Sequence, residues 1–289
     1  MEATKKYKLT SETIEIDGTI LHRIKALKDF SDVKAGDLGG WIEKEDNLSQ
    51  IGNAWIGGNA QVYDSVRVFG NAKVCDNAKV YGYVTICGNA RVCGNAVVFD
   101  NVIVFDNVMV CGNAKVHGNV QVYGNAMVNG NAQVYGIAKI YGNAWVSGNA
   151  QVCGYAMIGD NARVYGRSKV YDYAIVFGDA FIRDNAVIRG KVQISSTAQV
   201  YGDVQVYGNA QVYGNAQVYD NATISGDVRV FGNARIYGNA KVFETARVYG
   251  NAKVFEAARV YGNARIYGDA NVFGNAVIHN KADFYKNKY

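Results

Sequence analysis

The sequence predicts an all-β fold, a single-stranded parallel β-helix of about 12 to 13 triangular coils, from three observations. The first is a six-residue repeat, in which Val or Ile occupies every sixth position from Ile56 to Ile278 over 38 consecutive hexads without an insertion. The second is that Ala, Val or Ser stands two positions before each of these residues. The third is the composition, with 33 Gly and no Pro, and with Gly, Asn and Asp gathered at the ends of the hexads.

Each hexad predicts one side of a triangular coil. The stretch "QVYGNAQVYGNAQVYDNA", residues 205–222, shows the repeat three times. Residues two apart point to the same side of a strand, so Ala and Val face inward and the residue between them faces outward. Gly and Asn accept positive φ at low cost, which permits a corner every six residues. Three sides make an 18-residue coil, and coils stack about 4.8 Å apart.

The Ala-x-Val step followed by a Gly-Asn or Asp-Asn corner resembles the left-handed β-helix of the hexapeptide-repeat superfamily, from residue 51 to about residue 284. The left-handed sense is implied by this resemblance, because the period alone does not show it. Together with its N-terminal segment, the chain also looks like uncharacterised hexapeptide-repeat ("polymer-forming") proteins of phages and prophages. That resemblance implies a phage-encoded protein in the cytoplasm of a bacterial host.

The predicted domains are a capping segment at residues 1–50, the repeat at 51–284 and a short tail at 285–289. In the cap, "TIEIDGTILHRI" (13–24) places two β-rich runs around Asp-Gly, which indicates a β-hairpin. Trp41 and Ile42 are apolar enough to pack on the first coil. Near the other end, Phe284 stands where the next Val would be.

The bulk composition narrows the class of protein. A formal charge of +5 decides nothing about nucleic acid by itself. The N-terminus has no apolar core of a signal peptide, and no apolar run reaches membrane length, so a soluble cytoplasmic protein without a membrane partner is expected. The five Cys are expected to be reduced rather than bridged.

Histidines are the candidate catalytic residues. Resemblance to the hexapeptide superfamily implies two enzyme classes, acyltransferases and γ-class carbonic anhydrases. The acyltransferases generally use a His near a groove between subunits, often with an extruded loop around the acyl donor. The unbroken repeat leaves no such loop between residues 56 and 278, but His117, where Tyr or Phe is usual, is a candidate general base. A carbonic-anhydrase zinc site needs three convergent His. His117 and His279 are nine coils apart, so they cannot bind the same zinc ion within one chain. No bound metal and no cofactor are expected.

Three cysteines follow one another at the same place in successive coils, so they stack on one edge about 4.8 Å apart. This column is either a thiol or soft-metal site, or a place where small residues simply occur at an outward position. No Cys-x-x-Cys spacing supports a structural zinc site. The residues are Cys75, Cys93 and Cys111.

An apolar stripe interrupts the polar outward positions in the middle of the repeat. The members recur once per coil, and exposed patches of this kind usually mark an interface. Bulky residues replace the corner Asn there, so the corner is expected to be reshaped, because such residues adopt positive φ only at a cost. Trimers are common in the hexapeptide superfamily, so a homo-oligomer, with a trimer favoured, is expected. The stripe consists of Ile137, Tyr155, Met157, Tyr173 and Ile175.

A basic belt covers the C-terminal third, where seven consecutive hexads carry Lys or Arg outward with aromatic residues between them. Cations interleaved with aromatic rings are typical of surfaces that bind nucleotides or nucleic acid. A solvated face is the other interpretation, because Glu244 and Glu256 partly neutralise the belt. The candidate anion-binding residues are Arg229, Arg247 and Arg265, with Tyr249 and Tyr267 beside them.

These features favour a protein that is not an enzyme. The predicted function is a self-associating solenoid that acts as a binding or scaffold protein and sequesters an anionic, nucleotide-like ligand or a host partner. Two alternatives remain. One is an acyltransferase that uses His117 with an acyl-thioester donor, and the other is a purely structural phage protein.

Overall fold

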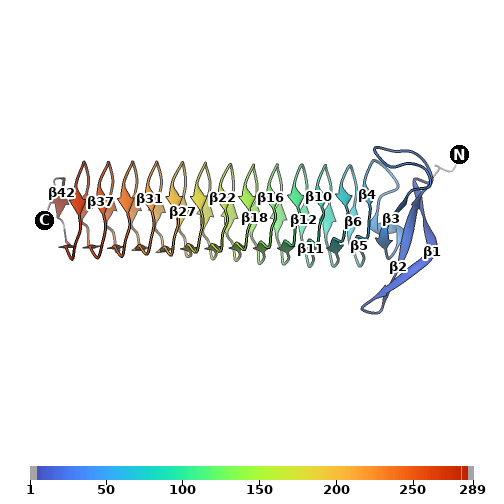
Figure 1. Ribbon diagram of the computed structural model, residues 1–289, viewed down its shortest axis with the longest axis horizontal. Coiled ribbons are helices and arrows are strands. Elements are labelled where there is room, and N and C mark those ends of the chain that lie inside the picture. Colours follow the sequence, from blue (N-terminus) through green and yellow to red (C-terminus); the bar gives the residue numbers. More distant parts are fainter. Residues whose placement is uncertain (1–4, 281, 286–289) are drawn as a thin grey trace. The chain divides into compact units, whose positions relative to one another are not determined.

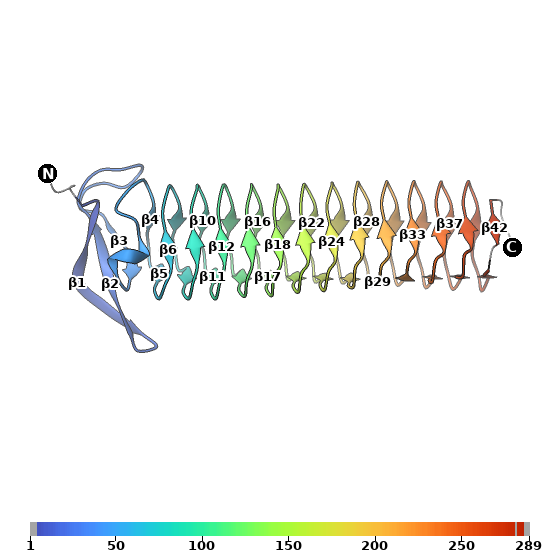
Figure 2. The same ribbon diagram turned by 180° about the vertical axis from the view of Figure 1, so that it is seen from behind.

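The computed structural model describes residues 5–280 and 282–285. The chain divides into two compact units, Met1–Gly142 and Asn143–Tyr289. Both units consist of short strands in the order of a parallel β-solenoid, so the predicted parallel β-helix is confirmed (Figures 1 and 2). Residues 286–289 of the predicted tail lie outside the described residues. Within the described ranges, no helix is long and apolar enough to span a bilayer.

The first unit opens with a hairpin (Figure 1). β1 (Tyr7–Ile16) and β2 (Thr19–Ala26) pair antiparallel around Asp17 and Gly18, whose φ angles are 48° and 82°. Positive φ at both central residues is the mark of a tight hairpin turn. β3 (Leu38–Ile42) pairs antiparallel with β2 and parallel with β5 (Gln61–Val62). Trp41 and Ile42, 8% and 0% exposed, thus pack on the first coil, as predicted.

The coils of the first unit place successive strands on three faces in turn. A 3₁₀ turn, η1 (Glu45–Asn47), precedes them. The first face holds β5, β8 (Lys79–Val80), β11 (Val97–Val98), β14 (Lys115–Val116) and β17 (Gln133–Val134); the second holds β4 (Trp55–Ile56), β7 (Lys73–Val74), β10 (Arg91–Val92), β13 (Met109–Val110) and β16 (Met127–Val128); the third holds β6 (Arg67–Val68), β9 (Thr85–Ile86), β12 (Ile103–Val104), β15 (Gln121–Val122) and β18 (Lys139–Ile140).

The second unit also places its strands on three faces in turn (Figure 2). Its last strand pairs Phe284 with Ile266, which confirms Phe284 in the place of the next Val. The first face holds β20 (Gln151–Val152), β23 (Lys169–Val170), β26 (Val187–Ile188), β29 (Gln205–Gly208), β32 (Thr223–Gly226), β35 (Lys241–Val242), β38 (Arg259–Val260) and β41 (Val277–Ile278); the second holds β19 (Trp145–Val146), β22 (Arg163–Val164), β25 (Phe181–Ile182), β28 (Gln199–Val200), β31 (Gln217–Val218), β34 (Arg235–Ile236), β37 (Lys253–Val254) and β40 (Asn271–Val272); the third holds β21 (Met157–Ile158), β24 (Ile175–Val176), β27 (Gln193–Ile194), β30 (Gln211–Val212), β33 (Arg229–Val230), β36 (Arg247–Val248), β39 (Arg265–Ile266) and β42 (Asp283–Phe284).

The interior of each unit is filled by the Val or Ile column and the Ala column, whose members are almost all fully buried. Backbone N–H groups donate to carbonyl groups of the next coil, as from Gln211 to Val228 at 2.8 Å. Ser168 is a polar member of the Ala column. Its buried hydroxyl donates to the carbonyl of Tyr165 at 2.9 Å, so burial leaves no unpaired group there.

The left-handed residue of a corner is the first one, usually Gly, and not the following Asn. Gly136, Gly154 and Asp172 have φ angles of 77°, 68° and 61°, whereas the bulky residues after them do not adopt positive φ. The prediction of a reshaped corner at those bulky residues is therefore wrong, because the second corner position carries no strain. Where Asn stands there, its amide forms a ladder, as from Asn215 to Asn233 at 3.0 Å.

Acidic residues replace Gly at the left-handed position in a regular way. Each such carboxylate accepts a hydrogen bond from the backbone N–H of the Gly at the same corner of the next coil. The bond from Gly238 to Asp220 measures 3.1 Å, and the bond from Gly262 to Glu244 measures 2.9 Å. The other pairs are Asp64–Gly82, Asp76–Gly94, Asp100–Gly118, Asp106–Gly124, Asp160–Gly178, Asp172–Gly190, Asp184–Gly202 and Glu256–Gly274.

Replacement of one corner carboxylate should therefore destabilise its coil. Asp220→Ala removes the acceptor for Gly238 and replaces a residue type that tolerates the φ of 59° with one that does not, so we expect a loss of about 1–3 kcal/mol in unfolding free energy. Asp220→Asn keeps an acceptor oxygen and a residue type that tolerates positive φ, so it should lose less than half as much. Urea denaturation compares the two variants. Equal stability of Asp220→Ala and the wild type would contradict this role.

Candidate functional site

His117 follows β14 in the first unit and stands within a column of stacked aromatic rings. Its imidazole lies between Phe99, with ring centroids 4.6 Å apart, and Tyr135, at 5.3 Å, with interplanar angles of 6° and 5°. The two neighbours fix the plane of the imidazole. Its side chain remains 32% exposed, so the ring edge is open to a substrate.

Asp100 supplies a carboxylate beside this imidazole. Its Oδ2 atom lies 3.7 Å from Nδ1 of His117 and accepts a hydrogen bond from the N–H of Gly118 at 3.0 Å. A carboxylate in this place favours the tautomer with the proton on Nδ1, which leaves Nε2 as a base. The separation between Oδ2 and Nδ1 is longer than a hydrogen bond, and catalytic contacts commonly shorten when substrate binds.

The sequence names His117 as a candidate general base, whereas the neighbouring Asp100 is not among its candidates. The signal is present in the sequence, because an acidic residue at the left-handed position reaches the next coil. The carboxylate then lies beside the residue 17 positions further along the chain, which comes just before the corresponding corner of the next coil. For Asp100 that residue is His117, and for Asp76 it is Cys93.

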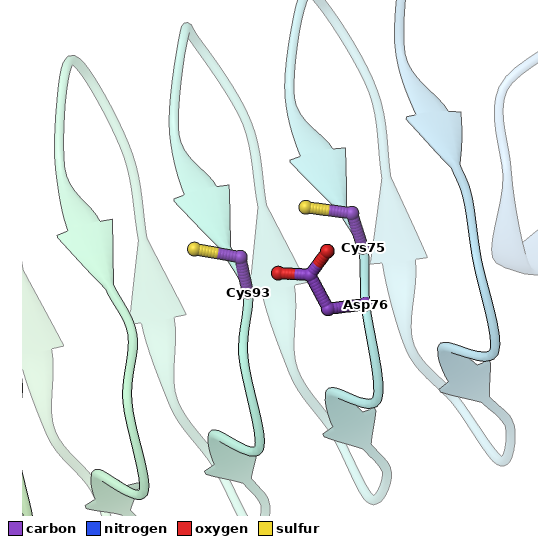
Figure 3. A group of neighbouring side chains, drawn as sticks. All are labelled: Cys75, Asp76 and Cys93. Atoms are coloured by element: carbon purple, nitrogen blue, oxygen red, sulfur yellow. The ribbon is translucent and has the colours of Figure 1, made fainter.

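The cysteine column is formed as predicted in the first unit, and Asp76 joins it. The ligand atoms of Cys75, Asp76 and Cys93 all lie within 4.8 Å of one another. Figure 3 shows both thiols pointing the same way, with the carboxylate of Asp76 directed from one coil towards the next. Burial, with a smaller effect of the Asp76 charge, raises the pKa of Cys75 to about 11. Burial also raises the pKa of Cys93 and Cys111, so these thiols are protonated at neutral pH and bind a soft metal only by losing protons.

The basic residues of the second unit form a ladder. Arg247 pairs in register with Arg229 on one side and Arg265 on the other, and all three are exposed. Tyr249 and Tyr267 stack beside them with ring centroids 5.2 Å apart. Like charges in register repel one another, and a bound anion relieves that repulsion. The assignment of these five residues to an anionic ligand stays a prediction.

Four members of the apolar stripe meet in the second unit. Tyr155 and Tyr173 are 49% and 54% exposed and stack with centroids 4.8 Å apart. Met157 and Ile175 pair in register two residues later. Ile137, 39% exposed, belongs to the first unit. The structure thus brings the two exposed tyrosines together with the half-buried Met157 and Ile175 in one apolar patch.

Comparison with known proteins gives a family repeat and two similar proteins. The family model described as YdcK Beta solenoid repeat matches seven segments of the chain. A curated protein of Escherichia coli (strain K12), named "Uncharacterized acetyltransferase YdcK", is 45% identical over 60 residues, and the match covers 18% of this chain and 18% of that protein. The chain therefore spans about a fifth of the relative that it matches. The matched segments are residues 90–105, 120–136, 138–154, 198–214, 216–232, 258–270 and 264–280.

Among solved structures, the chain resembles the crystal structure of UDP-N-acetylglucosamine O-acyltransferase (LpxA) from Moraxella catarrhalis RH4. The sequences are 14% identical, the TM-score is 0.26, and the likeness covers 63% of this chain and 71% of the other. A likeness of this size carries no argument about mechanism.

The relative's name corrects the functional prediction. The sequence favoured a scaffold that is not an enzyme and that sequesters a nucleotide-like ligand, but the curated relative is named an acetyltransferase, which favours the enzymatic alternative. The prediction failed because it took an unbroken repeat as a sign that no catalytic site exists. The unbroken repeat leaves no extruded loop, but adjacent corners still bring His117 and Asp100 together. The phage origin stays a prediction. The chain carries β-solenoid repeats of the YdcK kind, in segments between residues 90 and 280.

Proposed function

We propose that the protein is an acyltransferase that moves an acetyl group from a thioester donor to a hydroxyl or amino group. The observation that carries the proposal is the pair formed by His117 and Asp100, with Nδ1 3.7 Å from the carboxylate and the imidazole held between two rings. The acetyltransferase name of the curated relative supports the same reaction class.

In the proposed step, Nε2 of His117 accepts the proton of the acceptor hydroxyl or amine. The acceptor atom then attacks the thioester carbonyl and forms a tetrahedral intermediate. The intermediate collapses as the carbon–sulfur bond breaks, and the leaving thiolate takes the proton from His117. Asp100 stabilises the imidazolium that exists between the two proton transfers. The products are the acetylated acceptor and the free thiol.

The enzyme is proposed to work as a homo-oligomer, with a trimer favoured. The patch of Tyr155, Tyr173, Met157 and Ile175 supports this, because two stacked tyrosines about half exposed above an apolar pair form the kind of surface that usually becomes an interface. A second copy also offers the wall that a thioester donor needs beside an exposed imidazole.

Disruption of the patch should dissociate the oligomer. The double substitution Tyr155→Arg and Tyr173→Arg places two like charges one strand spacing apart, where repulsion and desolvation oppose burial against a second copy. Light scattering should give a multiple of 31.4 kDa for the wild type and a monomer for the variant. Arg163→Glu, on another face of the same unit, serves as the control and should leave the mass unchanged. A monomeric wild type would end this proposal.

The reaction itself is tested with acetyl-coenzyme A and a panel of sugars, amines and aminoglycosides. Release of coenzyme A is followed by chromatography, because the five cysteines of the protein would react with a thiol reagent. We expect release that depends on both protein and acceptor, and an acceptor mass increased by one acetyl group. Folded protein that releases no coenzyme A above background with any acceptor class would refute the proposed function.

A further inference from the structure

The corners of the second unit carry columns of stacked rings. Tyr219 and Tyr237 lie with centroids 4.8 Å apart and an interplanar angle of 1°. Phe243 and Tyr261 stack at 4.9 Å and 3°. Within one column, the rings of successive coils thus lie one above another, at the spacing between neighbouring strands.

The hexad that contains β32 leaves its ring position nearly empty. On the face formed by β29, β32 and β35, the corner residues are Tyr207, Ser225 and Phe243, so a hydroxymethyl group stands between two rings. The outward residue two positions before Ser225 is also small, because Thr223 pairs in register with the larger Gln205 and Lys241. The two small side chains produce a hollow of about 620 Å³ bounded by the larger residues of the neighbouring coils.

The hollow has the width of one further ring. Because Tyr207 and Phe243 are two coils apart, their rings are separated by about 9.6 Å, twice the strand spacing. A planar ring midway would lie about 4.8 Å from each, within the range of aromatic stacking. The opposite side of Tyr207 is already covered in this manner, because the planar guanidinium of Arg189 lies 4.8 Å from its ring centroid. Arg189, Tyr207 and Phe243 therefore place planar groups in this column, and the position above Ser225, between Tyr207 and Phe243, is open.

Polar groups surround the edge of this position. Ser225 and Thr223 provide hydroxyl groups at the floor, and Lys241 provides an exposed ammonium at the rim. Glu244 also borders the hollow, with its carboxylate held by the N–H of Gly262 at 2.9 Å. A hydrocarbon ring would leave these donors and acceptors unmatched, whereas a heteroaromatic ring with polar edge atoms would use them.

We propose that this hollow binds the base of a purine nucleotide, stacked between Tyr207 and Phe243, with the phosphate nearest to Lys241. Among the described residues that line the hollow, two rings and one cation, Lys241, fit a mononucleotide rather than a nucleic-acid strand, because a strand needs a row of such positions. The site lies in the second unit and does not depend on the acyl-transfer proposal for His117.

The test is calorimetry with AMP at low salt, on the wild type and on Ser225→Tyr. This variant inserts a ring into the open position and continues the column, so it should stay folded with an unchanged or higher melting temperature. We expect binding of AMP by the wild type and at least a tenfold loss of affinity in Ser225→Tyr. Ribose 5-phosphate, which has the phosphate but no base, should bind at least tenfold more weakly than AMP.

Two matched variants separate the site from general surface effects. Ser195→Tyr makes the same change in another column, between Phe177 and Tyr213, and should leave AMP affinity unchanged. Phe243→Leu keeps an apolar side chain but removes one stacking face, so it should weaken binding several-fold. The proposal is overturned if AMP does not bind below about millimolar concentration, if Ser225→Tyr binds as well as the wild type, or if Ser195→Tyr loses binding equally. A change in the oligomeric state of Ser225→Tyr without a change in AMP affinity would also overturn it, and would assign the hollow to a side chain of a second copy.

Discussion

Replacement of His117 by alanine should lower the rate of acetyl transfer by about 10²–10⁴-fold, the usual contribution of a general base. The imidazole is the group at this corner whose ring nitrogen can accept the acceptor's proton, and the carboxylate of Asp100 beside it supports the positive charge that results. The measurement is coenzyme A release at saturating acetyl-coenzyme A. The Michaelis constant for the donor should change little, because the proposed role concerns proton transfer and not donor binding.

His117→Phe is the matched control for folding. A phenyl ring at this corner preserves the stack with Phe99 and Tyr135, as rings do in the coils on either side, so its melting temperature should equal that of the wild type. Its activity should fall as far as that of the alanine variant. Asp100→Asn keeps an acceptor for the N–H of Gly118 but removes the charge, and we expect a smaller loss, about 10–100-fold. Full activity in His117→Phe would remove His117 from the mechanism.

The fold was predictable because its determinants are local and repeated. Ala and Val alternate with outward residues in every hexad, so the inward columns around Val212 follow from the period of the strand. The backbone conformation of each corner residue was harder to predict. Gly136 takes the positive φ and leaves Ile137 unstrained, a division between two adjacent residues that composition alone does not reveal.

Only one residue of the candidate site was predictable from the sequence, because its two residues lie in different coils. His117 was visible as a departure from the repeat, but Asp100 lies one coil earlier in the chain and looked like an ordinary corner residue. The same difficulty concealed the hollow above Ser225, which is defined by the rings at the same corner of the preceding and following coils. In a β-solenoid, a side chain contacts the residues at the same position of the preceding and following coils. The chemistry of a residue that differs from the repeat therefore depends on residues about 18 positions away as well as on its neighbours in sequence.

A single charge in the interior should unfold the coils around it. Val212 in β30 is fully buried and pairs with Ile194 and Val230. Val212→Asp would place a carboxylate among aliphatic side chains, where backbone donors are already used between coils, so we expect a loss of about 4–5 kcal/mol in unfolding free energy. Gln211→Asp is the matched control, because it adds the same charge one residue away on the outward side, next to Arg229. It should change stability by no more than about 0.5 kcal/mol.

The pH dependence of Val212→Asp identifies the cause of the loss. Burial raises the folded-state pKa of a carboxyl group above its unfolded value of about 3.9, so the charge-dependent loss develops as pH rises through that value and is largely absent below it. The deficit relative to the wild type should therefore be smaller at pH 3 than at pH 7. Val212→Asn, which is polar and of similar size but does not ionise, should show the same deficit at both pH values. Urea denaturation at the two pH values measures this, and an equal deficit for Val212→Asp at pH 3 and pH 7 would show that lost packing, and not buried charge, destabilises the coil.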